Sequence, residues 1–398
     1  MNDGSRLPSR PRVLVITASI GAGHRSVANT IVDSLRREAR GIDVDCIDAL
    51  DFAPRAFRLY YAGGFATAMS KFPFLYGLGF RLTNRLHGAK RSLPERRRLW
   101  CERLCLRRLA DHLQQTHPTL VVNTHFLPAP TIGRMIRRGQ IPTRQMVTVT
   151  DICVHRFWYS ENVERWFVPS EESAATLRQW GISDEAITVS GIAVHPKWTQ
   201  PLDGRAILAG WKLPPDRKIV TLTAGTEFTC GPVAKIARSL LDACGDLHLI
   251  VLVGRNEKLA RRLSSFPEAG DRMTVVPYTD RAHELVELSS LVVTKAGGVT
   301  TGECLAKAKP MVLLKPVPGH EAGNASYLQR QGAAVIASGH ADVAGLVKRL
   351  LADEGELARI SASARRLYRP GTQTIVTSIL QAALETPGHP SRAASCRD

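Results

Sequence analysis

Long apolar runs are absent from this sequence of 398 residues, although 44% of the residues are hydrophobic. No run approaches the roughly 20 apolar residues that a membrane-spanning helix needs, so we expect no transmembrane segment. The run that follows Arg6, Arg10 and Arg12 is also too short for a signal peptide, which favours a cytoplasmic location. The eight cysteines form neither a CxxC pair nor a regular framework, which predicts a reduced chain without a metal site.

Acidic residues are scarce in one segment. Residues 55–108 contain 13 Lys/Arg against 2 Asp/Glu and account for most of the formal net charge of +17. Bulky side chains, among them Phe72, Phe74, Leu75 and Tyr76, stand between the basic residues. A basic surface with embedded aromatic side chains suits an anionic membrane. A solvated helix over an ordinary core is the alternative, and nucleic acid is a third partner, which the many apolar residues disfavour.

The basic end of this segment, residues 91–113, is predicted to form one helix. Arg96, Arg97 and Arg98 lie on it and are the candidate membrane contacts.

Short apolar strands alternate with helices along most of the chain, which predicts a doubly wound α/β architecture. A stretch rich in proline and glycine, residues 193–218, divides the pattern into two halves of similar size. We therefore predict two Rossmann-like domains that face each other across a cleft. Ligands bind in such folds at the carboxyl ends of the strands. The predicted strands are RVLVIT, VDCID, LVVNT, QMVTVT and RWFVPS, then KIVTLTAG, HLIVLVG, RMTVVPY, SLVVTKAGG, PMVLLKPV and AAVIAS.

A glycine loop follows the first predicted strand and precedes a helix. Its sequence, GAGHRS at residues 21–26, matches only two glycines of the dinucleotide-binding pattern and includes His24. Asp45 and Asp48 on the next strand are candidates for binding a ribose, so a nicotinamide enzyme is one alternative. The other alternative is that the loop places an imidazole at a reaction site.

A second glycine loop, TKAGGVTTGE at residues 294–303, also runs from a strand into a helix. Its two glycines let the backbone approach a ligand, and the amides of a helix N-terminus attract a diphosphate. Glu303 lies one turn into that helix, where it is placed to accept hydrogen bonds from ribose hydroxyls. It would also be favoured there by the helix dipole alone.

A third loop follows the next strand and begins another helix. Glu321 and Asn324 are three residues apart there and so share a helix face. A carboxylate and an amide held together suit sugar hydroxyls, but they suit a capping arrangement equally well.

Three segments together resemble glycosyltransferase family 28: IGAGHRSVANTIVDSL, VTDICVHRFWYSENVERWFVPSEE and VTKAGGVTTGECLAKAKPMVLLKPVPGHEAGNA. They are most similar to its branch of monogalactosyldiacylglycerol synthases and processive diacylglycerol glycosyltransferases. The resemblance extends in order from about residue 12 to about residue 370. It implies a GT-B fold and inverting transfer from a nucleotide sugar without a metal or another cofactor. The sequence fits this implication, since no Asp-x-Asp motif stands at the carboxyl end of a predicted strand.

The resemblance also implies residue roles. His24, in the loop with Gly23, is the implied base for the acceptor hydroxyl, and unperturbed imidazole titrates near neutral pH. Ala22 or Ile20 replaces the third glycine usual in that loop, and Ala296 replaces a common proline. The implied donor-binding residues are Gly297, Gly298, Val299 and Thr300 at the diphosphate, Glu303 at the ribose, Glu321 and Asn324 at the transferred sugar, and Tyr278 beside the uracil.

Further matches lie in VTDICVHRFW. Asp151 and His155 belong to the shared pattern, and a structural role is favoured for Asp151. Arg156 and Trp158 are predicted to shape the mouth through which the acceptor enters.

The implied domains are an acceptor-binding, membrane-associating domain at 1–196, a linker at 197–216, a donor-binding domain at 217–370, and a helix and tail at 371–398. The implied substrates are UDP-glucose or UDP-galactose and diacylglycerol, at the cytoplasmic face of an anionic membrane, with no nucleic acid as partner. A polyprenyl-linked acceptor is an alternative. A sugar-nucleotide binding protein without catalysis is another, which the joint presence of His24, Glu303, Glu321 and Asn324 disfavours.

Overall fold

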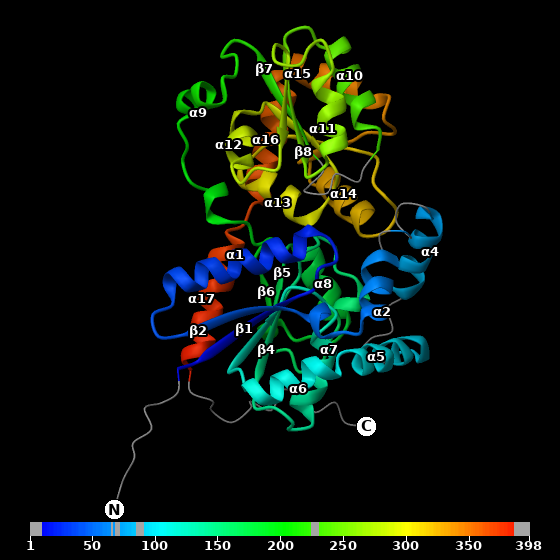
Figure 1. Ribbon diagram of the computed structural model, residues 1–398, viewed down its shortest axis with the longest axis vertical. Coiled ribbons are helices and arrows are strands. Elements are labelled where there is room, and N and C mark those ends of the chain that lie inside the picture. Colours follow the sequence, from blue (N-terminus) through cyan, green and yellow to red (C-terminus); the bar gives the residue numbers. More distant parts are fainter. Residues whose placement is uncertain (1–9, 65–66, 68–71, 85–90, 224–230, 386–398) are drawn as a thin grey trace, which may run out of the picture.

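The computed structural model describes residues 10–64, 67, 72–84, 91–223 and 231–385, and it contains two α/β domains (Figure 1). The N-terminal domain is built on six parallel strands in the order β2-β1-β3-β4-β5-β6. Five of them were predicted, whereas β6 has only three residues, too few for a recognisable pattern. The strands are β1 (Arg12–Thr17), β2 (Asp43–Asp48), β3 (Leu120–Asn123), β4 (Arg144–Thr148), β5 (Arg165–Val168) and β6 (Ile187–Val189).

Helices cover both faces of this sheet, because alternate residues of each strand point to opposite sides. Val13 and Val15 of β1 are buried against α1 (Ala22–Glu38) and α17 (Gly371–Leu384). Leu14 and Ile16 are buried on the other face, against helices α6 (Arg107–Thr116) and α7 (Ala129–Arg137). The other helices between β3 and α9 (Gly204–Trp211) are η3 (Arg156–Trp158), α8 (Glu171–Gln179), η4 (Asp184–Ala186) and η5 (Pro196–Trp198).

The C-terminal domain repeats the architecture with parallel strands in the order β12-β11-β10-β7-β8-β9. All six strands were predicted, since each is an apolar run typical of a strand buried on both faces. The strands are β7 (Lys218–Thr223), β8 (Leu247–Gly254), β9 (Met273–Pro277), β10 (Leu291–Thr294), β11 (Met311–Leu313) and β12 (Ala334–Ile336). The helices are α9 (Gly204–Trp211), α10 (Val233–Ala243), α11 (Glu257–Ser264), α12 (Ala282–Leu288), α13 (Gly298–Ala306), α14 (His320–Arg330), α15 (Asp342–Ala352) and α16 (Glu354–Leu367).

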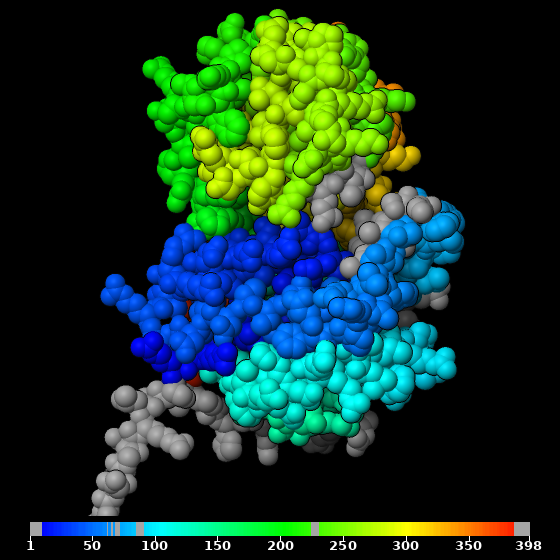
Figure 2. All heavy atoms as spheres, in the orientation of Figure 1, coloured from blue at the N-terminus to red at the C-terminus, as the bar shows by residue number. Residues whose placement is uncertain are grey.

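A helical insertion, residues 49–119, separates β2 from β3 and projects from one side of the N-terminal domain (Figures 1 and 2). The single helix predicted for 91–113 is two helices, because the chain turns at Leu106, whose side chain is buried in the core. The elements of the insertion are η1 (Ala49–Phe52), α2 (Arg55–Arg58), η2 (Leu59–Gly63), α4 (Pro73–Thr83), α5 (Leu93–Cys105) and α6 (Arg107–Thr116).

The chain crosses between the domains twice. The segment predicted as a linker, 197–216, includes α9, and its Leu208 and Trp211 pack with the core of the C-terminal domain. Helix α17 crosses back and packs on α1, and Thr372 donates a hydrogen bond of 2.6 Å to the Val194 carbonyl. The tail predicted beyond it, from residue 386, lies outside the described residues. A mixed core cluster that includes Ile192 and Met311 further joins the two domains.

Candidate active site

His24 stands at the end of the first strand, in the first turn of α1. The turn before it requires a positive φ, and Gly21 supplies it with φ 78°. The first turn of α1 thereby lies at the carboxyl edge of the sheet, where the ends of β3 and β4 also lie. This position agrees with the loop's predicted role in presenting an imidazole.

Two threonines from neighbouring strand ends hold the His24 ring. Its Nδ1 lies 3.0 Å from the Thr124 carbonyl oxygen and 2.8 Å from Thr150 Oγ1. A carbonyl oxygen can only accept a hydrogen bond, so this arrangement assigns the proton of neutral His24 to Nδ1. Nε2 then carries the free lone pair, and among the described residues no hydrogen bond occupies it. His24 is therefore oriented to take a proton at Nε2.

The surroundings keep His24 neutral. Burial lowers its pKa below the usual 6.5, while the nearby Asp151 carboxylate and the hydrogen bond to Thr124 oppose that shift. The ring of His125 stands edge-on to His24 at 4.5 Å, and its Nδ1 accepts a hydrogen bond from the Leu127 amide. Burial lowers the pKa of His125 well below its usual range. At neutral pH both rings are consequently uncharged, and Asp151 is placed to stabilise a charge that forms on His24.

The two predicted glycine loops do lie against each other. A side chain at Gly298 would place its Cβ 1.9 Å from the Thr150 carbonyl oxygen, so only glycine allows the domains to approach this closely. On the facing loop, a Cβ at Gly23 would lie 3.5 Å from Val299. The loop containing His24 and the loop predicted to bind the diphosphate therefore meet at one point between the domains.

Helix α13 presents its N-terminus at this point. Gly297 is its N-cap, Val299 and Thr300 lie in its first turn, and that turn contains no acidic residue. Among the described residues no side chain caps this end of the helix. Free amide groups at a helix N-terminus with its partial positive charge are a ready site for an anion. The geometry fits the diphosphate position predicted for Gly297, Gly298, Val299 and Thr300.

Glu303 lies one turn further along α13 and is partly buried. Burial raises the pKa of its carboxyl to about 8, and the positive charge of Lys197 only partly opposes the shift. The carboxyl is therefore largely protonated at neutral pH when no ligand is bound. A buried carboxyl that can be ionised by a suitable partner is typical of a binding site.

Glu321 and Asn324 occupy different environments on α14. The buried Glu321 carboxylate pairs with Lys295 Nζ at 3.2 Å, which places a cation next to the second glycine loop. The fully buried amide of Asn324 donates to the Ala296 carbonyl at 3.0 Å and accepts from the Cys153 amide at 3.1 Å. Asn324 thus joins the two domains in this structure, and its contact with a sugar stays a prediction.

The structure places Tyr76 in this region, which its sequence position did not suggest. Tyr76 was expected at the membrane with its neighbours on α4, but its hydroxyl lies 3.0 Å from His320 Nδ1, at the start of α14. Gly77 lies so close to Pro318 that a Cβ there would be 2.4 Å from the Pro318 ring. Helix α4 therefore contacts the donor-side loop 316–320.

Tyr278 follows β9 and is 58% exposed, with the Arg255 guanidinium 5.1 Å from its ring centre. Its place beside a uracil remains a prediction. Asp45, weighed as a ribose ligand of a nicotinamide enzyme, instead pairs with Arg12 at 2.7 Å.

Two residues expected at the acceptor mouth have structural contacts instead. Arg156 is 3% exposed, forms an ion pair with Glu95 at 3.4 Å and lies over the Tyr159 ring at 4.0 Å. Trp158 is 2% exposed and packs in the core, 6.1 Å from the His24 ring centre. His155 binds α4, because its Nε2 lies 3.1 Å from the Phe80 carbonyl. The prediction for Arg156 was wrong, since its charge is used inside the domain.

The insertion concentrates the exposed apolar side chains. Ten of the large apolar residues that are exposed among the described residues lie on it, and we call these ten the insertion surface. Only Tyr278 and Leu384 are comparably exposed elsewhere in the described chain. The insertion surface consists of Leu59, Tyr60, Phe72, Phe74, Leu75, Leu78, Leu82, Leu93, Trp100 and Leu104.

Of the three arginines predicted to contact a membrane, two are exposed and one is turned inward. Arg96 and Arg97 are exposed on α5. Arg98 binds the buried Glu102 carboxylate at 2.7 Å and lies over the Phe157 ring at 4.4 Å. The Arg98 charge is therefore paired within the protein, which argues against the membrane contact predicted for it. Among the described residues, no helix is long and apolar enough to cross a membrane, and no cluster of three metal-binding side chains occurs.

Comparison with known proteins finds two family models that match separate parts of the chain. Residues 24–194 match monogalactosyldiacylglycerol (MGDG) synthase, and residues 229–366 match the C-terminal domain of glycosyltransferase family 28. The processive diacylglycerol beta-glucosyltransferase of Bacillus thuringiensis (strain Al Hakam) is 29% identical over 385 residues, which cover 95% of this chain and 96% of the relative. The enzyme of the same name from Bacillus cereus (strain ATCC 10987 / NRS 248) gives the same identity and coverage.

Solved structures support the same architecture. MnaA of S. aureus with UDP aligns with a TM-score of 0.62 at 18% identity, covering 95% of this chain and 99% of that one. MurG of Acinetobacter baumannii aligns with a TM-score of 0.60 at 15% identity, covering 93% and 99%. At these identities the likeness concerns the fold, and it confirms the predicted GT-B arrangement of two Rossmann-like domains.

Proposed function

Since this chain belongs to the monogalactosyldiacylglycerol synthase branch of glycosyltransferase family 28, we propose that it transfers a hexose from a UDP-sugar to the hydroxyl of diacylglycerol, with inversion at the anomeric carbon. The observation that carries the proposal is the contact between the loop that holds His24 and the uncapped N-terminus of α13. One side offers a base with a free lone pair, and the other offers amides for a diphosphate.

The chemistry follows from these two positions. The diacylglycerol hydroxyl gives its proton to His24 Nε2 as its oxygen forms a bond to the anomeric carbon. The bond from that carbon to the diphosphate oxygen breaks on the opposite side, so the configuration inverts. The leaving UDP carries the negative charge that develops, and the amides of α13 together with Lys295 stabilise it. Asp151 stabilises the imidazolium until its proton passes to solvent.

Binding of the donor is assigned to the C-terminal domain. Glu303 accepts hydrogen bonds from the ribose hydroxyls, and Tyr278 lies beside the uracil. Glu321 binds the transferred hexose, glucose or galactose, after it exchanges part of its contact with Lys295. Asn324 either reaches the sugar after the domains move or keeps the two loops in place.

The acceptor must come from a bilayer, because diacylglycerol is almost insoluble in water. We infer that the insertion surface enters the membrane while Arg97, Arg107 and Arg108, which are exposed nearby on α5 and α6, face anionic headgroups. Helix α4 then leads from the membrane to the donor-side loop, since Tyr76 and Gly77 contact residues 318–320. This assigns the protein a peripheral place at the cytoplasmic face.

A direct test is incubation of the purified protein with labelled UDP-glucose or UDP-galactose and vesicles that contain diacylglycerol, followed by lipid extraction and chromatography. We expect labelled glycosyldiacylglycerol in the presence of excess EDTA. Vesicles with a polyprenyl phosphate in place of diacylglycerol serve as the second acceptor. Label only in the polyprenyl lipid would replace our acceptor, and activity that EDTA abolishes and magnesium or manganese restores would contradict the mechanism.

A further inference from the structure

A second hollow, away from the loops of the active site, is lined almost entirely by arginine. It lies between α5, α7 and the loop after η3, and its volume is about 490 Å³. None of its lining residues belongs to the donor or base positions described above. We call it the arginine pocket, and its lining consists of Arg91, Arg96, Leu99, Arg103, Arg134, Arg137 and Glu161.

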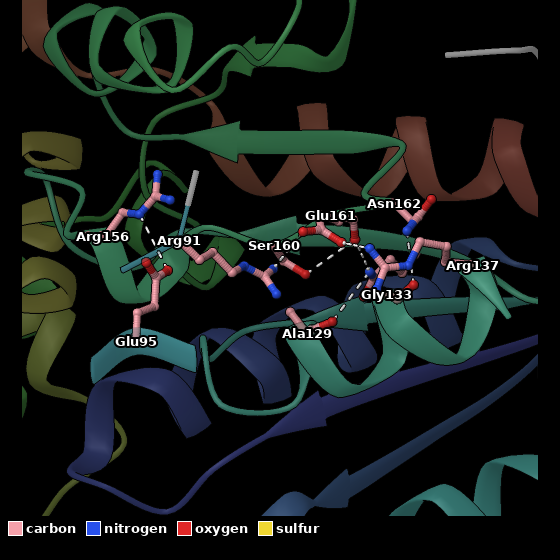
Figure 3. Close-up of polar contacts among 10 residues, drawn as sticks. Arg91, Glu95, Ala129, Gly133, Arg137, Arg156, Ser160, Glu161 and Asn162 are labelled. Carbon is pink, nitrogen blue, oxygen red and sulfur yellow. Dashed lines mark hydrogen bonds and ion pairs between the residues drawn. The ribbon is translucent and has the colours of Figure 1, made fainter. Parts of the chain in front are cut away.

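The charges of the arginine pocket are far from balanced. Glu161 is the one carboxylate of its lining, and it is shared by Arg91 at 3.3 Å and Arg137 at 2.6 Å. The two acids of α5 pair with other arginines, Glu95 with Arg156 (Figure 3) and Glu102 with Arg98. Five guanidinium groups therefore face a single carboxylate, and like charges this close repel one another unless an anion lies between them.

The pKa values of two arginines in the pocket reflect this repulsion. The pKa of Arg103 is lowered, first by burial and then by Arg134 and Arg91. The pKa of Arg134 is lowered by burial and by Arg138 and Arg137. Both shifts indicate positive charge held together without a matching acid.

A buried donor in the pocket lacks an acceptor. The Arg91 side chain is only 16% exposed, and its Nε is buried without a hydrogen-bond partner among the described residues. A buried donor left unpaired is costly and calls for an explanation, and an unobserved anion is one such explanation.

The floor of the pocket is rigid. The backbone carbonyl of Glu161 accepts a hydrogen bond from the Gln145 side-chain amide. The Asn162 side chain donates to the Gly133 carbonyl at 2.9 Å (Figure 3). A Cβ at Gly133 would lie 2.1 Å from the Glu161 carbonyl oxygen, so α7 and this loop are in direct contact. The backbone of α7 that bears Arg134 and Arg137 is therefore fixed before any ligand arrives, which lowers the cost of binding one.

We propose that the arginine pocket is a binding site for a phosphate group, separate from the donor site. Guanidinium groups bind phosphate oxygens through paired, charge-assisted hydrogen bonds, and several of them together suit its two or three oxygens. Leu93, Trp100 and Leu104 are exposed on the same helix, α5, so the phosphate can be that of a phospholipid headgroup in a membrane. A soluble phosphate compound offers the same chemistry and is the second source. The inference does not depend on the proposed transferase activity.

The test compares two pairs of substitutions with the same change in charge. Arg103→Gln with Arg134→Gln removes two arginines of the pocket. Arg37→Gln with Arg40→Gln removes two exposed arginines, at and just after the C-terminal end of α1, that neither line the pocket nor belong to the proposed membrane contact. Calorimetric titration of the full chain with inorganic phosphate and with sn-glycerol 3-phosphate gives the affinities.

We expect wild type and the control pair to bind both probes, and the pocket pair to bind at least about tenfold more weakly, as for a lost hydrogen bond to a charged group. Phosphate should also raise the thermal midpoint of wild type but not that of the pocket pair. No binding by wild type, or equal losses in both pairs, would overturn the proposal. Arg96→Gln, a single change on the exposed rim of the pocket, replaces the pocket pair if that variant does not fold.

A second arm distinguishes the sources of the phosphate. Wild type preloaded with labelled inorganic phosphate is mixed with phosphatidylcholine vesicles, with or without phosphatidylglycerol. If the label is released only by vesicles with phosphatidylglycerol, and the control pair behaves in the same way, the ligand is a lipid headgroup. Retention of the label with both kinds of vesicle identifies a soluble phosphate compound.

Discussion

The two domains share one architecture and differ in what interrupts it. In the C-terminal domain each strand leads through a helix to the next parallel strand. In the N-terminal domain the insertion at 49–119 stands between β2 and β3, and β4 leads to β5 through only the three-residue η3. Ten of the exposed large apolar side chains lie on that insertion, whereas Tyr278 is the only one we find among the described residues of 217–370. In our proposal the regular parts of both domains position the reacting groups, and the insertion takes the acceptor from the membrane.

The comparison also assigns different chemistry to the matching glycine loops. In the N-terminal domain the loop places an imidazole, His24, in the first turn of the helix. In the C-terminal domain the first turn, at Val299 and Thr300, holds no ionisable side chain and leaves its amides free. The first turn of a helix can therefore either carry the side chain that acts as a base or leave its amides free to bind an anion, according to which residues occupy it.

Removing His24 is expected to have the largest effect. His24→Ala should lower turnover by about 10²–10⁴-fold, because proton removal from the acceptor is lost. UDP affinity should stay unchanged, since the base lies on the acceptor side. Steady-state kinetics and calorimetry measure the two quantities, and Arg25→Ala, an exposed change in the same helical turn, is the control. Near-normal turnover in His24→Ala would assign the base to another residue.

Reversing charge on the insertion should separate its role from that of the C-terminal domain. Arg97→Glu, Arg107→Glu and Arg108→Glu together should weaken binding to anionic vesicles by at least about 3 kcal/mol, roughly a hundredfold or more, because the attraction of three arginines is lost and repulsion is added. Acceptor presented in detergent should still be glycosylated.

The matched control places the same charge change on the C-terminal domain, at the exposed Lys258, Arg262 and Arg365. Flotation with liposomes at physiological salt gives the bound fraction. Equal binding by the two triple variants would show that the insertion is not the membrane contact.

Glu303 should make UDP binding depend on pH. The pKa of the Glu303 carboxyl is about 8 in the free protein, so below that pH the carboxyl must lose its proton when UDP binds. The affinity for UDP should therefore rise as the pH increases toward about 8 and level off above it. Glu303→Gln should remove this slope. Because the folded pKa lies above the usual 4.5, this carboxyl lowers stability progressively as the pH rises from about 4.5 to about 8, and the full cost is present above pH 8, so Glu303→Gln should also raise the thermal midpoint at pH 8.5. A parallel slope in both proteins, measured by calorimetry, would exclude Glu303 from the donor site.

Loss of the contact between the insertion and the C-terminal domain should have the smallest effect. Tyr76→Phe removes one hydrogen bond to His320, worth about 1 kcal/mol. We expect faster amide exchange in α4 and a change in detergent activity below about fivefold. Unchanged exchange in α4 would mean that this bond does not hold the helix to the donor-side loop.

The regular fold could be predicted because buried parallel strands are near-continuous apolar runs. Eleven predicted strands appear, and only the three-residue β6 was missed. The position of His24 followed from a strand, a glycine turn and a helix that are adjacent in sequence. Its hydrogen bonds to Thr124 and Thr150 did not, since they join residues 100 and 126 positions apart.

Other features depended on tertiary contacts that no local pattern encodes. Arg98 resembles its neighbours on α5, and only the packing of Glu102 beneath it directs it inward. The amide of Asn324 is engaged by Cys153, from the other domain. The arginine pocket combines residues from two helices and a loop, so its charge imbalance is visible only in the fold.

The central claim is that His24 deprotonates an acceptor that attacks the sugar opposite the diphosphate held at α13. The most direct measurement is the anomeric configuration of the glycolipid made from a UDP-hexose, whose sugar is α-linked, and diacylglycerol. We predict a β-linked product, recognised in the proton NMR spectrum by the large coupling between its axial protons at carbons 1 and 2, and no such product from His24→Ala. An α-linked product, or no glycolipid from the wild-type protein, would contradict the account.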